Sequence, residues 1–553
     1  MTSSAHVEIE SKFEVGDETP APAPDAFAPL VAGEPVVHRL SATYLDTADL
    51  SLTRHKITLR RRTGGDDDGW HLKLPAETGR LELHAPLGDD DEVPAELVAA
   101  VAGLVRNRPL TPVARIDNER RVLLLRDDAG VPVVEFCDDR VTTESLTGVT
   151  TGGGGDWREW EAEIVDPDLP GSEEHLAAVS AACAAAGGTP SSSESKLARA
   201  LGTLPAAFPP GVSAVKDALA ADLNQLLDHD PGARRGAMRG IHQMRVAVRG
   251  LRSTIGTYAT ELTAETEDTD LDLPALLGEL KVLAAVLGKV RDLQVVDERL
   301  ERLAEEFTDD LVSPVTRERI RTELGAEERR AQTRVAAALA SDRYLELVDR
   351  LHELVEVAGS DPAAGGGKKK EKATSKENSG VSPTKRKRAA QDMVLRGVDR
   401  QFAKFTKVRT RTERDLDSLD LTLAQREELT HVVRKRAKAL RRNVNALPES
   451  GDLSVAPLRT ACQRLHTVLG DVQDSVTARF WLRRIARRAE AAGESTFGLG
   501  VLFEHERGFS ERALAGFEHD AATVTAAYRE LAESRRAARR RKGKKGDKGK
   551  KKH

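Results

Sequence analysis

The chain has 553 residues, 39% of them hydrophobic and 4% aromatic, and a formal net charge of −5 at pH 7. This length exceeds what one hydrophobic core usually supports, so we expect at least two domains. Cys137, Cys183 and Cys462 are too scattered for a disulfide framework or a zinc site, and no run reaches the roughly 18 apolar residues of a membrane span. Because the N-terminus also lacks a signal-peptide core, the sequence predicts a cytoplasmic protein.

The first predicted element is a β-strand over residues 6–14, in which charged residues alternate with apolar or small ones. One face carries Glu8, Glu10, Lys12 and Glu14, and the other carries Val7, Ile9, Ser11 and Phe13. Taken alone, such a strand is typical of a solvated sheet edge. The alternative is a polar face that lines an interior, and it requires other strands with the same pattern.

Four further segments repeat the pattern, at residues 56–62, 70–74, 80–84 and 159–164. Their polar faces carry Lys56, Thr58, Arg60, Arg62, His71, Lys73, Arg80, Glu82, His84, Glu159, Glu161 and Glu163. A closed barrel turns these faces inward, and helices such as the alanine-rich run 173–186 cover its apolar outside. The sequence therefore predicts a polar tunnel with acids and bases on its wall.

The chemistry of this wall favours a metal-assisted phosphate site. Carboxylates suit a hard divalent cation such as Mg²⁺ or Mn²⁺, and Arg and Lys suit phosphate oxygens. The chain shows neither a Ser/His/Asp arrangement nor a P-loop. Hydrolysis by metal-activated water is therefore the predicted reaction, and which carboxylate orients the water stays open.

Residues 8–12, EIESK, resemble the ExExK signature of the CYTH superfamily, the triphosphate tunnel metalloenzymes. The segments YLDT at 44–47, LRRR at 59–62, WHLK at 70–73, EAE at 161–163 and SK at 195–196 follow in the family's order. The resemblance implies an antiparallel eight-stranded β-barrel over residues 1–205. It implies metal binding by Glu8, Glu10, Glu161 and Glu163, triphosphate contacts from Lys12, Arg60, Arg62, Lys73, Arg120 and Lys196, and catalytic roles for Glu8, Glu10, Lys12 and Lys73.

Some tunnel positions stay ambiguous. Arg115, Arg120 and Arg121 compete for one role on a strand that is unusually acidic for the family. Glu135 and Asp138 fall on opposite faces of the next strand unless a bulge intervenes. Glu14 has no predicted role.

Beyond a proline-rich linker at 206–212, strand signals end and helical periodicity dominates to about residue 530. His242, Arg245, Arg249 and Arg252 form one stripe of a predicted helix, and His431, Arg434, Lys438 and Arg441 repeat that spacing. The helix after each stripe also repeats, at 286–292 and 468–474. Two copies indicate a duplicated all-α bundle over 213–530, so the chain as a whole is of the α+β class.

The duplicated stripe resembles the CHAD domain, an all-helical module linked with inorganic polyphosphate. The resemblance implies that both stripes line a polyphosphate-binding surface, which Lys281, Lys289 and Arg291 extend in the first copy. The second copy has Gln463, Asp471 and Gln473 instead, so the halves are not equivalent. A structural role for each histidine, at a helix contact, is the alternative.

Two basic segments of low complexity are predicted to be disordered, an insertion at about 360–388 and a tail at 531–553. Such runs attract any polyanion, but no RRM, zinc-finger or helix-turn-helix signature accompanies them, and stacking aromatics are lacking. Polyphosphate is therefore the predicted polymer partner, with no specific nucleic acid and no membrane. Association with polyphosphate granules is consistent with this.

The sequence thus predicts a metal-dependent inorganic triphosphatase joined to a polyphosphate-binding module. Two alternatives remain open. The tunnel could act on a nucleoside or thiamine triphosphate, or cyclise ATP as a class IV adenylate cyclase does. The chain could also be a polyphosphate-binding protein without catalysis, although the expected charges are all present in the sequence.

Overall fold

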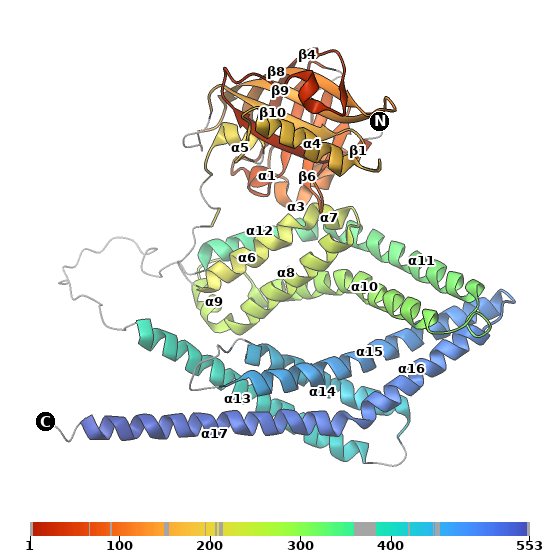
Figure 1. Cartoon of the computed structure of the whole chain (residues 1–553). Coiled ribbons are helices and arrows are strands. Elements are labelled where there is room, and N and C mark those ends of the chain that lie inside the picture. The colour runs from red at the N-terminus through yellow and green to blue at the C-terminus, as the bar shows by residue number, and fades with distance from the viewer. Residues whose placement is uncertain are drawn as a thin grey trace. The chain divides into compact units, whose positions relative to one another are not determined.

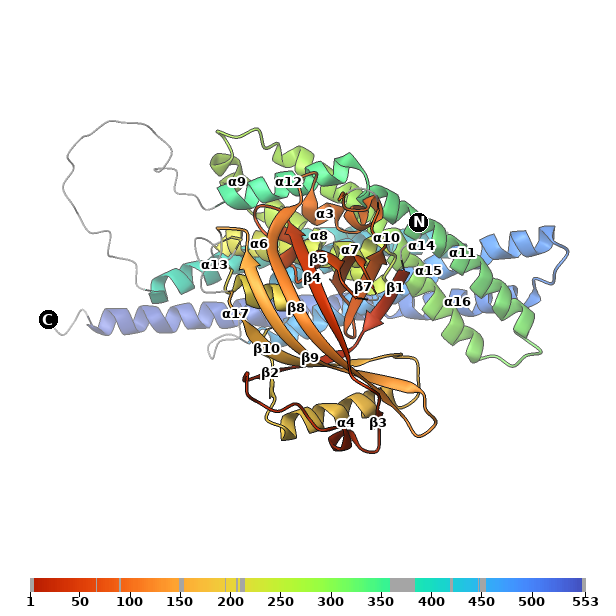
Figure 2. The same ribbon diagram turned by 90° about the horizontal axis from the view of Figure 1, so that it is seen from above.

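The strands between Ser4 and Ile164, with one short strand at Thr189–Pro190, form one curved antiparallel sheet, seen as a barrel in the computed structural model (Figures 1 and 2). The structure describes residues 4–549 except 66, 89–90, 149–153, 194, 205–206, 209–213, 359–382, 418–420, 446 and 448–453. The long strands are β1 (Ser4–Glu8), β2 (Glu10–Val15), β4 (Val36–Asp46), β5 (Thr58–Thr63), β6 (Gly69–Pro75), β7 (Arg80–Ala85), β8 (Thr111–Arg126), β9 (Pro132–Ser145) and β10 (Trp157–Ile164). Two short strands, β3 (Val31–Ala32) and β11 (Thr189–Pro190), are added at the margins.

The sheet closes through its first strand. Its strand order is β1-β7-β6-β5-β4-β8-β9-β10-β2-β11, so β1 and β2 lie at opposite ends although only Ile9 separates them in sequence. Glu8 is paired with Arg80 of β7, and Glu10 with Glu163 of β10. If β1 and β2 are counted as one strand, eight long strands form the barrel, which confirms the predicted architecture.

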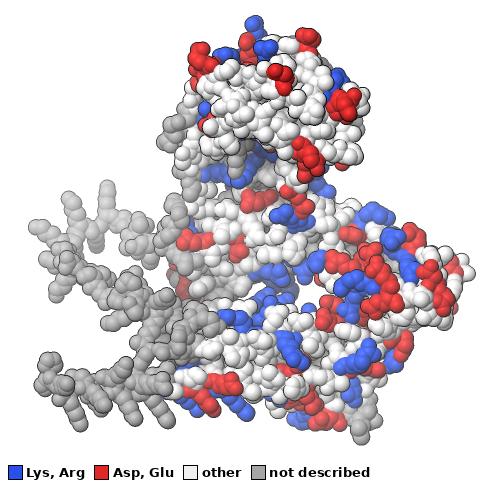
Figure 3. Space-filling model, in the orientation of Figure 1, with Lys and Arg blue, Asp and Glu red and all other residues white. Residues whose placement is uncertain are grey.

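Alternation along the strands separates an apolar outside from a polar inside. On the outside, Phe13, Phe136 and Trp160 pack into one buried cluster with α4 (Ser172–Ala185), which lies along β2, β9 and β10 (Figure 2). This helix confirms the predicted run 173–186. Each large apolar side chain buried in this way contributes about 1.5–3 kcal/mol. In Figure 3 the barrel surface turned toward the viewer carries scattered charges of both signs among uncharged side chains.

One predicted strand is too long. Lys56 has a φ of 61° and lies in the turn after α1 (Ser51–Arg54), and β5 begins at Thr58. The reason is that Lys56 and Ile57 donate backbone hydrogen bonds back to α1 instead of to a neighbouring strand. Lys56 therefore does not share the inward face of Arg60 and Arg62.

The described chain falls into two compact units, residues 1–291 with 329–367 and residues 292–328 with 368–553. The first unit holds the barrel, with η1 (Pro24–Phe27), α2 (Ala95–Ala100), α3 (Ala102–Val105) and α5 (Lys196–Leu201), and the helices α6 (Ala214–Asp228), α7 (Asp230–Arg234), α8 (Met238–Thr257), α9 (Ala259–Glu265) and α12 (Asp342–Val357). Two long helices, α10 (Leu273–Glu305) and α11 (Pro314–Leu339), contribute a part to each unit.

Within the first unit, polar contacts join the barrel to the helices. His55 Nδ1 lies 2.6 Å from Asp228 Oδ1, and the Arg106 guanidinium donates to Asp349 at 2.9 Å. Beneath α3, the fully buried Asp230 accepts from Tyr344 Oη at 2.7 Å. A buried, hydrogen-bonded carboxylate cannot shift without losing partners, so this contact fixes α7 against α12.

The second unit holds α13 (Pro383–Leu416), α14 (Leu423–Asn445), α15 (Ala456–Ala491), α16 (Phe497–Ala515) and α17 (Phe517–Gly549). Helices α13, α14, α15 and α17 share a core that includes Phe405, Val433, Leu465 and Phe517. None of the described helices, in either unit, combines the length and apolarity needed to cross a bilayer.

Parts of the two segments predicted to be disordered are helical. Helix α17 continues to Gly549, so the predicted disordered tail at 531–553 is helical over most of its length, and residues 550–553 lie outside the described residues. Ala, Arg and Lys extend a helix that is already nucleated, which explains the difference. Residues 360–382 of the predicted insertion lie outside the described residues, and 383–388 begin α13. Most of the predicted linker 206–212 is also outside them.

Candidate functional site

The barrel encloses a cavity of about 1420 Å³, and all ten tunnel residues predicted from the sequence line it. They are Glu8, Glu10, Lys12, Arg60, Arg62, Lys73, Arg120, Glu161, Glu163 and Lys196. Nine of them lie on strands, and Lys196 is the first residue of α5, whose N-cap Ser195 accepts the Ala198 N–H. Strand alternation and one helix cap thus bring residues from positions 8 to 196 into a single cavity.

One wall is built around Glu8 and Glu82. Lys73 Nζ donates to both Glu8 oxygens, at 2.8 and 2.6 Å, and lies 3.6 Å from Glu82. His71 Nδ1 is 2.7 Å from Glu82 Oε1. Burial, with the charges of Arg60 and Arg62, lowers the pKa of His71 to about 4, so a neutral imidazole donates to Glu82 at neutral pH. Although burial opposes it, Lys73 and this hydrogen bond hold the pKa of Glu82 well below its usual range.

The other wall is built around Glu161, which three bases contact. Lys12 and Lys196 donate to its Oε1 at 2.5 and 2.7 Å, and Arg120 pairs with its Oε2. Arg120 also forms a bidentate pair with Asp139, at 2.8 and 2.6 Å. These cations outweigh burial and hold the pKa of Glu161 well below its ordinary value. The bases of this wall therefore stay charged and fixed in position.

Lys196 is held by two acids that the sequence prediction did not include in the site. Its Nζ lies 2.6 Å from Glu159 Oε1 and 2.9 Å from Asp139 Oδ2. Both acids are buried, and neither lines the cavity. They position the base from behind.

Between the walls, Glu10 and Glu163 face each other across β2 and β10. Lys12 lies 3.0 Å from Glu10, whereas Glu163 forms no ion pair with any residue that the structure describes. Burial and the charges of Glu10 and Glu161 raise the pKa of Glu163 to about 7. Burial and a hydrogen bond with Glu82 likewise raise the pKa of Glu8 to about 8. Negative charge is therefore less compensated at Glu163 and Glu8 than at Glu82 and Glu161.

The four predicted metal ligands do not form one compact group. Among the described residues, ligand atoms lie within 4.8 Å of one another in two groups, His6–Glu8–Glu82 and Asp139–Glu159–Glu161. Each group contains one predicted ligand, and Glu10 and Glu163 belong to neither. The reason is electrostatic, since Lys73 holds Glu8 on one wall while Lys12 and Lys196 hold Glu161 on the other.

The closed barrel resolves the positions that the sequence left ambiguous. Arg120 points to the tunnel acids, whereas Arg115 is exposed and lies 3.4 Å from Asp117. Glu135 lines the cavity, and Asp138 instead pairs with Arg158 on the outer face. Neither Arg121 nor Glu14 lines the cavity. Arg121 is exposed, and Glu14 accepts hydrogen bonds from Ser192.

Sequence reasoning missed Asp139, although a signal existed. Asp139 shares the inward face of β9 with Glu135 and Cys137 by period two, but the ambiguity between Glu135 and Asp138 concealed that register. Glu82, His71 and Glu159 were assigned to polar faces but were given no role. Tyr44 lies within the YLDT segment, and its hydroxyl accepts from Arg60 at 3.4 Å.

In the first unit, the predicted stripe of His242, Arg245, Arg249 and Arg252 lies on α8. Burial and the charges of Arg291, Arg249 and Arg245 lower the pKa of His242, so Arg291 of α10 lies near the stripe. Lys281 and Lys289 are exposed on α10. The structure thus brings α8 and the start of α10 into one basic surface.

In the second unit, His431, Arg434, Lys438 and Arg441 lie on α14. Arg441 donates to Nδ1 of His466, a residue of α15 that the prediction missed, at 3.0 Å. Burial and the charges of Arg441, Arg434 and Lys438 lower the pKa of His466 to about 4. Asp471 and Asp474 of α15 also lie near Arg434, so this copy has a mixed charge.

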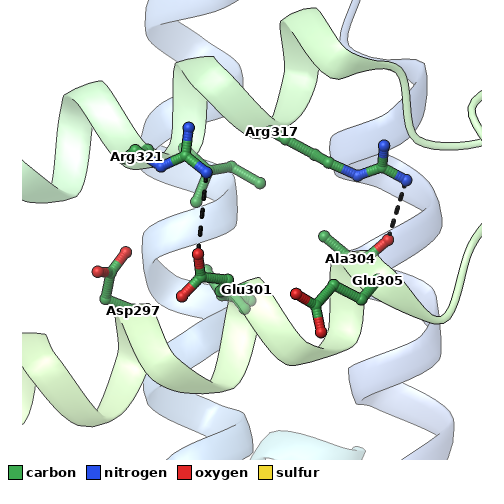
Figure 4. Close-up of a pocket in the computed structure, with 8 residues that line it drawn as sticks. Asp297, Glu301, Ala304, Glu305, Arg317 and Arg321 are labelled. Carbon is green, nitrogen blue, oxygen red and sulfur yellow. Dashed lines mark hydrogen bonds and ion pairs between the residues drawn. The ribbon is translucent and has the colours of Figure 1, made fainter.

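A smaller pocket lies between α10 and α11 in the second unit. Figure 4 shows Asp297, Glu301 and Glu305 of α10 opposite Arg317 and Arg321 of α11. Arg321 lies 3.8 Å from Glu301. None of the predicted site residues lines this pocket.

The family comparison agrees with the geometry of both regions. The model of the CYTH domain matches residues 6–164, and the model of the CHAD domain matches residues 217–483. The chain belongs to the CYTH and CHAD families. CYTH domains are metal-dependent domains of triphosphatase-like and cyclase-like enzymes and bind triphosphates, and CHAD domains are associated with polyphosphate.

Several known proteins are similar to this CYTH–CHAD chain. Two uncharacterized proteins from two strains of Mycobacterium tuberculosis are 36% identical, covering 97% of the chain and 98% of their own length. PptA from Streptomyces chartreusis is 16% identical, covering 56% of this chain and 99% of its own, with a TM-score of 0.37. The CHAD domain from the plant Ricinus communis is 18% identical, covering 58% and 93%, with a TM-score of 0.36.

Proposed function

We propose that the CYTH barrel is a metal-dependent hydrolase of short phosphate chains and that inorganic triphosphate is its preferred substrate. One observation carries the proposal: six bases from four strands and one helix line the same cavity as the predicted carboxylate ligands. In phosphoryl transfer the protein mainly positions groups and offsets charge, so such a set is what the reaction requires.

The arginines offer donors that protein groups do not use. Nε of Arg60 and Nε of Arg62 are buried without a hydrogen-bond partner, which usually costs about 1–3 kcal/mol per group. Phosphate oxygens would satisfy both donors, because a guanidinium binds phosphate through paired N–H groups. Lys12 and Lys73, now paired with Glu161 and Glu8, would exchange to phosphate oxygens when substrate binds.

The acids fit a hard cation. Glu8, Glu10, Glu161 and Glu163 offer oxygen donors only, which suits Mg²⁺ or Mn²⁺. The two walls and the residues between them hold seven carboxyl groups and six bases, so the tunnel by itself has little excess of positive charge for a polyanion. When bound, the cation would supply that charge and activate water for attack on the terminal phosphorus.

The substrate test compares phosphate release from inorganic triphosphate, ATP and thiamine triphosphate, each with Mg²⁺ or Mn²⁺. We expect a clear preference for inorganic triphosphate, since no nucleoside pocket is evident in the sequence. Equal rates on all three, or cyclic AMP as a product of ATP, would contradict this choice of substrate.

The catalytic test uses Glu10→Ala, because Glu10 contacts only Lys12 among the described bases. We expect loss of turnover with co-sedimentation on polyphosphate intact. Glu119→Ala, at a half-exposed outer position of β8, is the matched control and should leave turnover unchanged. If the wild-type protein hydrolyses no triphosphate with either metal, the chain is a binding protein and not an enzyme.

The CHAD region is proposed to bind polyphosphate through the α8 and α14 stripes. Replacing Arg245 and Arg249 together with Gln should weaken co-sedimentation and reduce its dependence on salt, since fewer counterions would be released. Unchanged binding would favour the structural role for this stripe. We also propose that the protein is cytoplasmic and that its helical region binds polyphosphate granules there.

A further inference from the structure

One residue of the helical region lines the tunnel cavity. Arg235 follows α7, and it appears in the cavity wall together with Glu8, Lys73 and the β6–β7 turn. Gly236, with a φ of 81°, lets the chain turn sharply between α7 and α8. The turn places the Arg235 side chain at the opening of the barrel.

The position of Arg235 is well defined within the first unit. The buried Asp230 holds α7 through Tyr344 and Arg234, and Gly103 of α3 packs directly on its carboxylate. In the part of the chain that the structure describes, no carboxylate forms an ion pair with Arg235. Partial burial alone lowers its pKa, so its charge is not balanced by a neighbouring acid.

A second arginine continues the path. Nη1 of Arg239, at the start of α8, lies 3.8 Å from Glu77 of the β6–β7 turn, and Glu77 also lines the cavity. Both side chains are exposed, so this ion pair is weak and exchanges readily with other partners. From Arg239 the steps to His242, Arg245, Arg249 and Arg252 are three or four residues, which makes them neighbours along one helix surface. That surface runs for about 20 Å.

We propose that Arg235 and Arg239 extend the anion path of the tunnel onto α8, so that the barrel hydrolyses the ends of linear polyphosphates longer than triphosphate. The inference rests on the proposed triphosphatase function and names a wider substrate class for the same site. In each turnover a water oxygen bonds to the terminal phosphorus as its bridging P–O bond breaks. The bridging oxygen keeps the electron pair on the shortened chain, and the proton passes to the product phosphates.

The acids at this opening set the limits of the path. Asp166 and Asp168, which follow β10, also line the cavity near its rim. They repel a phosphate chain, so the chain is expected to leave the tunnel on the side of Arg235. A charge reversal there should therefore act more strongly than a neutral substitution.

The test measures kcat/KM for inorganic triphosphate and for a purified polyphosphate of defined length, with the full chain and Mg²⁺ or Mn²⁺. In the double variant Arg235→Gln with Arg239→Gln, we expect kcat/KM for the long chain, divided by kcat/KM for triphosphate, to fall about tenfold. The fall should come from a higher KM for the long chain. Arg235→Glu should lower this ratio further. Arg39→Gln, at an exposed outer position of β4, is the matched control and should leave the ratio unchanged.

Three results would overturn the inference. If the ratio of the two kcat/KM values is unchanged in the double variant, the two arginines do not select chain length. This holds whether both kcat/KM values fall equally or neither falls. A wild-type protein that hydrolyses triphosphate but not the long chain removes the inference and leaves the proposed function intact. Inactivity on both substrates removes the proposed function itself.

Discussion

Replacing Asp139 by Asn should destabilise the barrel, because Asp139 is a fully buried carboxylate between two bases. Its oxygens accept from Arg120 at 2.8 and 2.6 Å and lie 2.9 Å from Lys196 Nζ. Breaking a buried ion pair usually costs about 3–5 kcal/mol. Arg120 and Lys196 keep Glu161 as a partner, so we expect the lower end, about 3 kcal/mol.

The assay is urea unfolding followed by tryptophan fluorescence. Trp70, Trp157 and Trp160 are buried in the barrel. To remove the signal of the fourth tryptophan, Trp481→Phe is introduced into the wild type and into each variant that is assayed. With an m-value of about 2 kcal/mol/M, a loss of about 3 kcal/mol lowers the midpoint by roughly 1.5 M. The variant should also raise KM for triphosphate, because Arg120 and Lys196 lose a support.

Asp138→Asn is the matched control on the same strand. Asp138 forms a bidentate pair with Arg158 at 2.7 Å on the outer face, and Arg158 also donates to the Asp17 carbonyl. Because Arg158 keeps the carbonyl oxygens of Asp17 and Thr19 as partners, the replacement should cost less than that of Asp139, about 1–2 kcal/mol, and leave KM unchanged. Equal midpoints for the two variants would refute the reasoning that the inner cluster depends on Asp139.

Three further outcomes are expected. Burial lowers the pKa of His352 to about 4, so below its ordinary pKa the unfolded chain binds a proton that the folded chain does not. The free energy of unfolding should therefore fall as the pH drops from about 6.5 to about 4. His352→Gln should make this fall less steep, as measured by urea midpoints across that pH range. Gly103→Ala should cost about 2 kcal/mol, since its Cβ would lie 2.6 Å from a buried carboxylate of α7, whereas Gly256→Ala, with open space around it, should be neutral or stabilising; similar urea midpoints would contradict this. Arg441→Met should raise the pKa of His466 above about 4 in an NMR titration, and an unchanged value would mean that burial alone sets it.

The β-barrel and its inward residues were predictable because strand periodicity is local. Alternation in residues 6–14 and in four later segments assigns each side chain to a face before any contact is known. The CHAD stripes were predictable for a similar reason, since His242 and His431 begin the same helical spacing. The tail at 531–553 was not, because its residues continue a helix that begins outside that segment.

The sequence by itself determined which side chains face the tunnel and which lie on one helix surface, since both follow from the repeat of a single element. Only the closed barrel decided which base meets which acid: Arg120 and not Arg115, Asp139 behind Lys196, and Glu163 without an ion pair among the described residues. Only the packing of α7 on α3 brought Arg235 to the cavity. The physical reason is range: periodicity acts over neighbouring residues, whereas ion pairing in a buried cluster depends on strands and helices that are far apart in the chain.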